Sequence, residues 1–200
     1  QSVQAQALAE LLMGFGRPVS GRMLVDGESV TDVMPESLRQ CAHWVAPDGA
    51  LVTGSVRDNI IESNNHQHDV DLLDVSKTAR LEDTIQQLPD GLATIITPGD
   101  DRLNGDDAFR IGLARASMSG ASVIVIEEPA LRFDHAVEQQ SVSAIHSLVN
   151  HNAITVVLPE RLETLRLCDQ VVMLHDHQLA EIGTHAQLIQ HNELYRHLNY

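Results

Sequence analysis

Basic side chains are scarce in this sequence. The 200 residues contain 13 Lys and Arg against 28 Asp and Glu, which gives a formal net charge of -15 at pH 7. Binding to nucleic acid draws on counterion release by clustered Lys and Arg, and attachment to anionic lipid needs a basic surface as well. The composition therefore argues against both as direct partners.

Cysteine and long apolar runs are also in short supply. Cys41 and Cys168 lie far apart without metal-site spacing, so we expect two reduced thiols in a cytosolic compartment. No apolar run approaches the roughly 18 residues that cross a bilayer, and the first residues do not resemble a signal peptide. The hydrophobic fraction of 43% is nevertheless ample for the core of one domain, or of a core plus a small lobe.

Helical and strand patterns alternate along the chain. The apolar residues of 3–13 recur at helical spacing, residues 58–119 are mostly helical, and 135–149 are helical again. A final helix is expected around Leu188 to Leu198. Strands are predicted at 22–27, 41–46, 122–129, 153–158, 170–175 and 178–183. The runs 122–129 and 153–158 have the continuous apolar character of strands buried on both faces. This alternation predicts an α/β fold with a mostly parallel sheet.

Six segments stand in an informative order and spacing. They read GFGRPVSGRMLVDG, PESLRQ, GSVRDNI, RIGLARA, VIVIEEP and VVMLHDHQLAEIGTHAQLI. Together they resemble the nucleotide-binding domain of ABC transporters, of the exporter or type I secretion kind, over essentially the whole chain. The resemblance implies a RecA-like (P-loop NTPase) core with an inserted helical subdomain. Residues 1–57 would be the first part of the core, 58–119 the helical subdomain and 120–200 the second part of the core.

The resemblance also implies strands that precede residue 1. The chain opens with QSVQAQALAELLMGF, which reads as the middle of a motif. We therefore expect a core that is N-terminally incomplete, belonging to a longer polypeptide with membrane helices upstream.

The phosphate-binding loop of that family, G-x-x-x-x-G-K-[ST], is not preserved. Its glycines let backbone N–H groups wrap the phosphates, its Lys neutralises charge, and its hydroxyl holds Mg²⁺. Aligned on LLMGF, the last glycine falls on Gln4, the Lys on Ala5, and the hydroxyl positions on Gln6 and Ala7. Gln4 and Gln6 could hydrogen-bond a phosphate without bringing charge. The alternative is a purely structural helix start.

Other family positions around the phosphates are changed as well. The Gln that senses Mg²⁺ is replaced by Pro47, which has no N–H and a fixed φ. The Asp that organises Mg²⁺ is replaced by Glu127, and the switch His by Glu160, whose charge would repel a phosphate. Glu128 stands at the position of the general base that activates water, and Asp134 keeps the acid of the loop that contacts the partner subunit.

The signature motif L-S-G-G-Q reads Leu103, Asn104, Gly105, Asp106, Asp107. In the family, the Ser hydroxyl, the glycine amides and the helix N-terminus of one subunit close on the γ-phosphate held by the other. Acids at a helix N-terminus stabilise the helix by roughly 0.3–1 kcal/mol. For a bound triphosphate the same acids are unfavourable, because a carboxylate and a phosphate charge about 5 Å apart repel by roughly 3 kcal/mol at an effective dielectric near 20. We expect these carboxylates to occupy the anion site that ATP would use.

Two histidine pairs, His66 with His68 and His175 with His177, have the spacing of possible metal ligands. Both fall in polar turns or loops, so we expect solvated side chains and no metal site.

Three functions remain open at this point. The first is a catalytically degenerate cassette domain without a cofactor. It would be a structural or regulatory partner that docks on the coupling helices of a transmembrane domain and forms a homo- or heterodimer with another nucleotide-binding domain. The second is an ATPase domain that binds Mg·ATP and powers export only in an assembled dimer. The third is an acidic interaction module that recruits a secreted substrate. In the transporter readings the domain lies at the cytoplasmic face of the inner (plasma) membrane without inserting into it.

Overall fold

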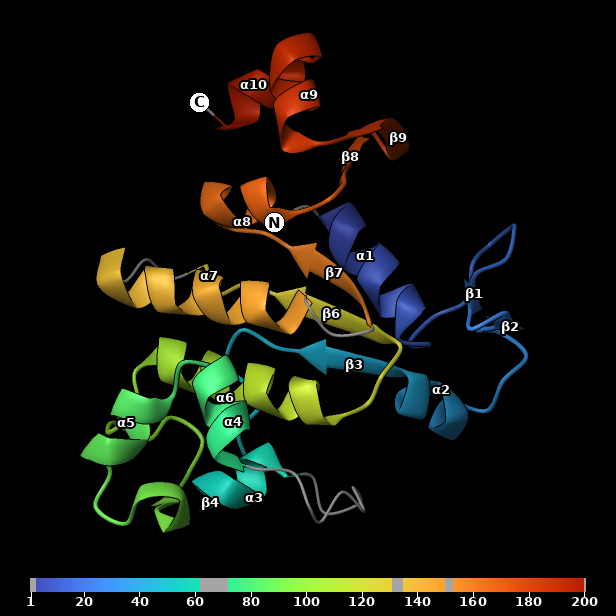
Figure 1. Cartoon of the computed structure of the whole chain (residues 1–200). Helices are drawn as coiled ribbons and strands as arrows, with labels where there is room; N and C mark the ends of the chain where they lie inside the picture. The colour runs from blue at the N-terminus through green and yellow to red at the C-terminus, as the bar shows by residue number, and fades with distance from the viewer. Residues whose placement is uncertain (1–2, 62–71, 131–134, 150–152, 200) are drawn as a thin grey trace.

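The computed structural model of the chain describes residues 3–61, 72–130, 135–149 and 153–199 (Figure 1). Within these ranges, no helix combines the length and the apolar character needed to cross a membrane.

A parallel sheet lies at the centre of the molecule. Its three strands, in spatial order, are β3 (Ala42–Val45), β6 (Val123–Glu127) and β7 (Ile154–Leu158). The first four residues of β6 are buried, as their uninterrupted apolar run predicts for a central strand. Because helices connect the strands, the predicted α/β class with a parallel sheet is confirmed.

The burial of β7 differs from the prediction. Residues 153–158 were expected to form a strand buried on both faces, but only Leu158 is buried, and Ile154 is 69% exposed. Strand β7 pairs with β6 on one side and with no other described strand. Composition favours the extended conformation, whereas burial depends on neighbours that the local sequence does not specify.

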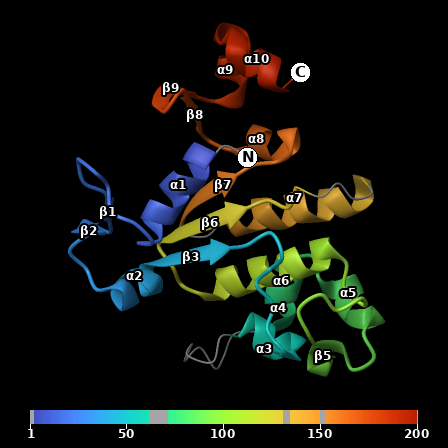
Figure 2. The ribbon, with the colours of Figure 1, turned by 180° about the vertical axis from the view of Figure 1, so that it is seen from behind.

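Helices cover both faces of the sheet (Figures 1 and 2). These layers are formed by α1 (Val3–Leu12), α2 (Pro35–Cys41), α6 (Gly105–Met118) and α7 (His135–Val149). Helices α6 and α7 share a buried cluster with Ile124 and Ile126 of β6. Helices α1 and α2 share another with Val123 and Val125, which point to the opposite face. The predicted helices at 3–13 and 135–149 are thus confirmed.

A short hairpin follows α1. It consists of β1 (Leu24–Val25) and β2 (Glu28–Ser29), which pair antiparallel. The two residues between them, Asp26 and Gly27, have φ values of 52° and 83°. Two consecutive left-handed residues are the geometry of a type I′ turn, and they end the strand that was predicted at 22–27.

The region between β3 and β6 forms a lobe with its own core. It contains β4 (Gly54–Ser55), α3 (Val56–Ile60), α4 (Leu72–Thr78), α5 (Glu82–Gln87), a 3₁₀ turn η1 (Gly91–Ala93) and β5 (Ile95–Ile96). Ile60, Leu81 and Ile96 are fully buried in this core. Helix α6 joins the two regions, because Ile111 packs in the lobe and Phe109 packs against the sheet. The boundaries at 57/58 and 119/120 stay predictions.

The C-terminal part begins after β7. Its elements are α8 (Leu162–Leu167), β8 (Val171–His175), β9 (Gln178–Gly183), α9 (His185–His191) and α10 (Glu193–Asn199). The predicted hairpin of β8 and β9 is confirmed. The single final helix is wrong, because Asn192 ends α9 and its Oδ1 accepts the N–H of Tyr195 at 2.7 Å within α10. Helices α2 and α8 were not predicted.

Candidate functional site

Acidic residues follow the two strands β6 and β7 at the same edge of the sheet. Glu127 and Glu128 come at the end of β6, and Glu160 follows β7. The carboxyl ends of parallel strands are where α/β domains place their ligand sites. A cavity of 280 Å³ opens here, lined by Pro129, Ala130, Glu138, Glu160, Arg161, Leu162 and Glu163.

Glu128 does not line this cavity, because its side chain is turned into the protein. It is fully buried, and both of its oxygens accept hydrogen bonds. Oε2 accepts the backbone N–H groups of Glu160 at 2.7 Å and of Arg161 at 3.1 Å. Oε1 accepts the hydroxyl of Thr164 at 2.6 Å and Nη1 of Arg161 at 3.1 Å. A buried carboxylate with these charge-assisted partners is held in one position.

Arg161 was not singled out from the sequence. Its side chain is 7% exposed, and besides pairing with Glu128 it contributes to the wall of the cavity. Its Nη2 is buried and has no hydrogen-bond partner among the residues that the structure describes. The signal that could have found it is its place directly after Glu160, since an acid buried at the end of one strand needs a cation or amides from the next.

The positions of the phosphate-binding loop lie in the first turns of α1. Gln4 and Ala5 are partly buried, whereas Gln6 and Ala7 are exposed. The methyl group of Ala5 packs at the edge of the apolar cluster under α1 and lines a different, apolar cavity. Glu160 and Ala5 thus face two separate cavities, and the described residues do not bring the predicted phosphate positions into one.

Two further predicted positions, Glu127 and Pro47, are not among the residues that line the cavity. Glu127 ends β6 and is partly buried, and Pro47 is partly buried in the turn after β3. In that turn, the carboxylate of Asp48 accepts the N–H of Ala50 at 3.0 Å.

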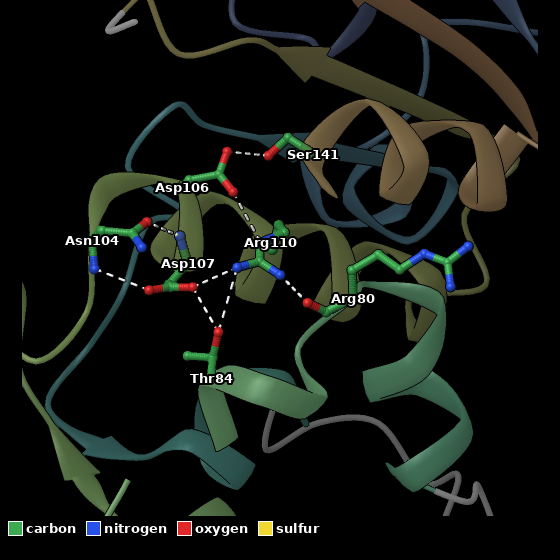
Figure 3. A network of polar contacts seen from close by, with 7 residues as sticks. All are labelled: Arg80, Thr84, Asn104, Asp106, Asp107, Arg110 and Ser141. Atoms are coloured by element: carbon green, nitrogen blue, oxygen red, sulfur yellow. Dashed lines mark hydrogen bonds and ion pairs between the residues drawn. The ribbon is translucent and has the colours of Figure 1, made fainter. Parts of the chain in front are cut away.

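The signature positions form a capping box at the start of α6 (Figure 3). Oδ1 of Asn104 accepts the N–H of Asp107 at 2.9 Å, and Oδ2 of Asp107 accepts the N–H of Asn104 at 3.0 Å. Asn is among the best N-cap residues. The exchange of Ser for Asn at this position therefore preserves the helix start.

Arg110 gathers both acidic side chains beneath this helix start (Figure 3). Its Nε lies 3.0 Å from Oδ2 of Asp106, and its Nη2 lies 2.5 Å from Oδ1 of Asp107. Its Nη1 donates to the carbonyl of Arg80, between α4 and α5. The i,i+3 and i,i+4 spacing of these three residues on one helix could have predicted the pairs.

The acids also tie α6 to two neighbouring helices. Asp107 accepts the hydroxyl of Thr84 in α5 at 2.7 Å, and Asp106 accepts the hydroxyl of Ser141 in α7. Asp106 is fully buried and Asp107 is 6% exposed. Burial raises the pKa of Asp106, against the lowering effects of the Ser141 hydrogen bond and the Arg110 charge.

The orientation of the two acids bears on one expectation. The carboxylates of Asp106 and Asp107 were expected to occupy an anion site at the helix N-terminus; Asp107 accepts the N–H of Asn104 at the start of α6, and both carboxylates lie on Arg110. That they take the place of a bound phosphate stays a prediction. Their mutual repulsion is offset by this shared cation and by two hydroxyl donors. The physical reason is that Arg110 lies one turn along the same helix, where it can pair with both inward-facing carboxylates.

Some predicted residues fall elsewhere. Asp134, His66 and His68 lie outside the described residues. His175 and His177 are exposed, His175 as the last residue of β8 and His177 in the turn between β8 and β9. In the part of the chain that the structure describes, no three His, Cys, Asp or Glu side chains form a group that could hold a metal ion.

The cysteines are both free and partly buried. Burial is the main cause that raises the pKa of the Cys168 thiol, which donates to the carbonyl of Thr164.

Comparison with known proteins places this geometry in a family. No protein-family model matches the chain. The chain is 30% identical over 195 residues to an ATP-dependent lipid A-core flippase of Ralstonia nicotianae, covering 96% of this chain and 33% of that protein. It is 29% identical to the mycobactin import ATP-binding/permease protein IrtB of Mycolicibacterium thermoresistibile, covering 91% of this chain and 31% of that protein. The chain thus spans about a third of the length of these relatives.

A solved structure agrees with the sequence relatives. A bacterial Atm1-family ABC exporter with ATP bound superposes with a TM-score of 0.83 at 27% identity, over 96% of this chain and 34% of that one. The parallel sheet, the helices on both of its faces and the lobe inserted ahead of β6 define a cassette-type α/β domain. The chain belongs to the nucleotide-binding domains of ABC exporters.

Proposed function

We propose that this domain neither binds Mg·ATP nor hydrolyses it, and that it acts as a structural or regulatory partner in an ABC exporter assembly. The observation that carries the proposal is that both carboxylate oxygens of Glu128 are engaged in hydrogen bonds. They accept hydrogen bonds from the side chains of Arg161 and Thr164 and from two backbone amides. A general base must reach the water whose proton it takes. With the side chain buried and turned away from the cavity, Glu128 serves instead as an anchor for the start of α8.

The charges around the cavity support the same conclusion. Catalysis of phosphoryl transfer rests on cations and donors aimed at the γ-phosphate. The cavity presents three carboxylate side chains, Glu138, Glu160 and Glu163, and one guanidinium, that of Arg161. That guanidinium is already paired with Glu128. At the Lys position of the phosphate loop stands Ala5, which brings no charge.

The expected partners follow from the relatives. The two relatives are about three times this length; one is named a flippase, and the other is named a mycobactin import ATP-binding/permease protein. We propose that this domain docks on the coupling helices of a transmembrane domain and pairs with a second nucleotide-binding domain at the cytoplasmic face of the membrane. No cofactor is needed for that role.

The alternative is an ATPase that is active only in the assembled dimer. It is favoured by the names of the relatives, which include an ATP-dependent flippase, and by the ATP bound in the matching exporter structure. For that activity, dimer closure would have to release Glu128 from Arg161 and bring it to a water.

A titration with Mg·ATP distinguishes the two. Isothermal titration is made on the polypeptide that contains this domain, alone and in its assembled complex with the partner's sites blocked. We expect no saturable heat up to about 1 mM, the concentration that corresponds to roughly -4 kcal/mol of binding free energy. A micromolar dissociation constant would contradict the proposal and favour the ATPase.

A further inference from the structure

Two stretches of chain connect the inserted lobe to the sheet. The chain enters the lobe through residues 46–53, which follow β3 and form neither helix nor strand, and it returns to β6 through α6 (Figure 1). The lobe has an apolar core separate from the one that α6 and α7 share with the sheet. The contacts between the entering stretch, residues 46–53, and α6 therefore bear on whether the two parts move together.

Arg115 of α6 bridges these stretches. Its Nη1 donates to the carbonyl of Gly49 at 3.0 Å and to that of Ala50 at 3.4 Å, both in the entering stretch. Its Nε donates to the carbonyl of Asn59 in α3, the first helix of the lobe, at 2.7 Å. The rigid fork of a guanidinium can serve such separate acceptors at once, which the single ammonium group of lysine cannot. One side chain thus joins the returning helix to the entering stretch and to the lobe.

The side chain of Asn59 continues this connection. Its Oδ1 accepts the N–H of Val52 at 2.9 Å, and its Nδ2 donates to the carbonyls of Val52 at 2.9 Å and Ser55 at 3.0 Å. Asn59 is 1% exposed, so its side chain is shielded from water. Asn59 therefore fixes the far end of the entering stretch to α3, while Arg115 fixes its turn to α6.

That turn has a backbone conformation which residues other than glycine seldom adopt. The φ values are +68° at Gly49 and +45° at Ala50. A left-handed alanine is strained, and it persists where surrounding groups impose it. Here the carboxylate of Asp48 accepts the N–H of Ala50 at 3.0 Å, and Nη1 of Arg115 donates to its carbonyl. The bonds from Arg115 therefore stabilise a turn that relaxes without them.

We propose that Arg115 acts as a latch between the lobe and the sheet: the two parts open together while it is in place, and the lobe opens on its own once it is released. A hydrogen bond from a charged donor is roughly twice as strong as one from a neutral donor. Arg115 makes such bonds to carbonyls 56 and 66 residues away. This inference does not depend on whether the domain binds or hydrolyses ATP.

Hydrogen exchange at single amides tests the latch in the longest polypeptide that contains this domain. The amides of Val56 and Leu81, which donate to carbonyls within the lobe, report on the lobe, and that of the fully buried Val125 in β6 reports on the sheet. Arg115→Met keeps much of the apolar stem and removes the donors. Arg102→Met is the matched control, because Arg102 bonds only to Asp100 and to the carbonyl of Ile95 among the described residues.

The measured quantity is the ratio of lobe exchange to sheet exchange. In the wild type and in Arg102→Met we expect the lobe amides to exchange within about tenfold of Val125. In Arg115→Met we expect this ratio to rise at least about tenfold, because charge-assisted hydrogen bonds are lost. A wild-type ratio above about tenfold, a smaller rise in Arg115→Met, or an equal rise in Arg102→Met would overturn the proposal.

Arg115→Lys covers the case in which the methionine variant does not fold. Lysine keeps the charge but cannot contact the carbonyls of Gly49 and Asn59 together. The ratio should therefore still rise above that of the wild type. A lysine variant with the wild-type ratio would show that the fork of Arg115 does not couple the two parts, and would overturn the proposal as well.

Discussion

Arg161 pairs with the carboxylate of Glu128: Nη1 of Arg161 lies 3.1 Å from Oε1 of Glu128, and both side chains are buried. The two residues are thirty-three positions apart, and each follows the end of a different parallel strand. The pair therefore fixes the start of α8 on the end of β6. It also gives a structural role to Glu128, the acid that the resemblance places at the general-base position.

Removal of one partner of this pair is predicted to be costly. Arg161→Met leaves Glu128 buried without a cation, and breaking a buried pair in this way lowers the free energy of unfolding by about 3–5 kcal/mol. Urea unfolding measures it, with Glu163→Gln on the exposed side of α8 as the control, expected within about 0.5 kcal/mol of the wild type. In the double variant Glu128→Gln/Arg161→Met we expect a large part of the loss to be regained. A loss that is the same in the wild-type and Glu128→Gln backgrounds would show that the pair contributes nothing.

The pH dependence of stability should carry the signature of Asp106. Burial raises its pKa in the folded protein above the ordinary value of 3.8, so the folded state binds this proton more readily than the unfolded chain. The contribution of Asp106 to the free energy of unfolding is therefore fully present below that ordinary value, and it is lost as pH rises through the raised pKa. We expect the stability of Asp106→Asn relative to wild type to increase between about pH 4 and pH 8.

Unfolding of both proteins across that range provides the measurement. Asp101→Asn, at an exposed site, is the control and should change the pH profile little. A relative stability of Asp106→Asn that falls as pH rises would mean that Arg110 outweighs burial and lowers the pKa instead.

Gly49 is predicted to be required in the turn after β3. Its φ is +68°, and a Cβ there would lie 1.8 Å from the carbonyl oxygen of Ala108 in α6. Gly99 has a similar φ of +75° with open space around it. Gly99→Ala should cost only the backbone strain of about 1–2 kcal/mol, and Gly49→Ala clearly more, because α6 must move away from the turn. Thermal unfolding compares them, and equal losses would show that the contact with Ala108 is unimportant.

The sequence predicted best what depends on local pattern. The continuous apolar run of β6 identified a central strand because helices cover both faces of a parallel sheet and bury side chains that point either way. A similar run in β7 misled the prediction of burial, because only the neighbouring elements decide whether Ile154 is covered. The break at Asn192 was missed because apolar residues keep helical spacing on both sides of it.

The site residues also differ in whether local sequence spacing could place them. Asn104 and the two acids after it could be placed at a helix start from spacing alone, and the pairing with Arg110 was within reach of the same reasoning. The partners of Glu128 could not be found this way, because they come from a different strand end that is adjacent only in the fold. Ser141 likewise reaches Asp106 from another helix, thirty-five residues away.

The most direct test of the account is ATP turnover at this domain's own site. The domain is assembled with its partner, the partner's nucleotide sites are inactivated, and phosphate release is compared for wild type, Glu128→Gln and the control Asp101→Asn, whose exposed side chain does not line the cavity. We predict that wild type and the Asp101→Asn control release phosphate no faster than a sample without protein. Turnover that is present in wild type and Asp101→Asn but abolished in a folded Glu128→Gln variant would contradict the account.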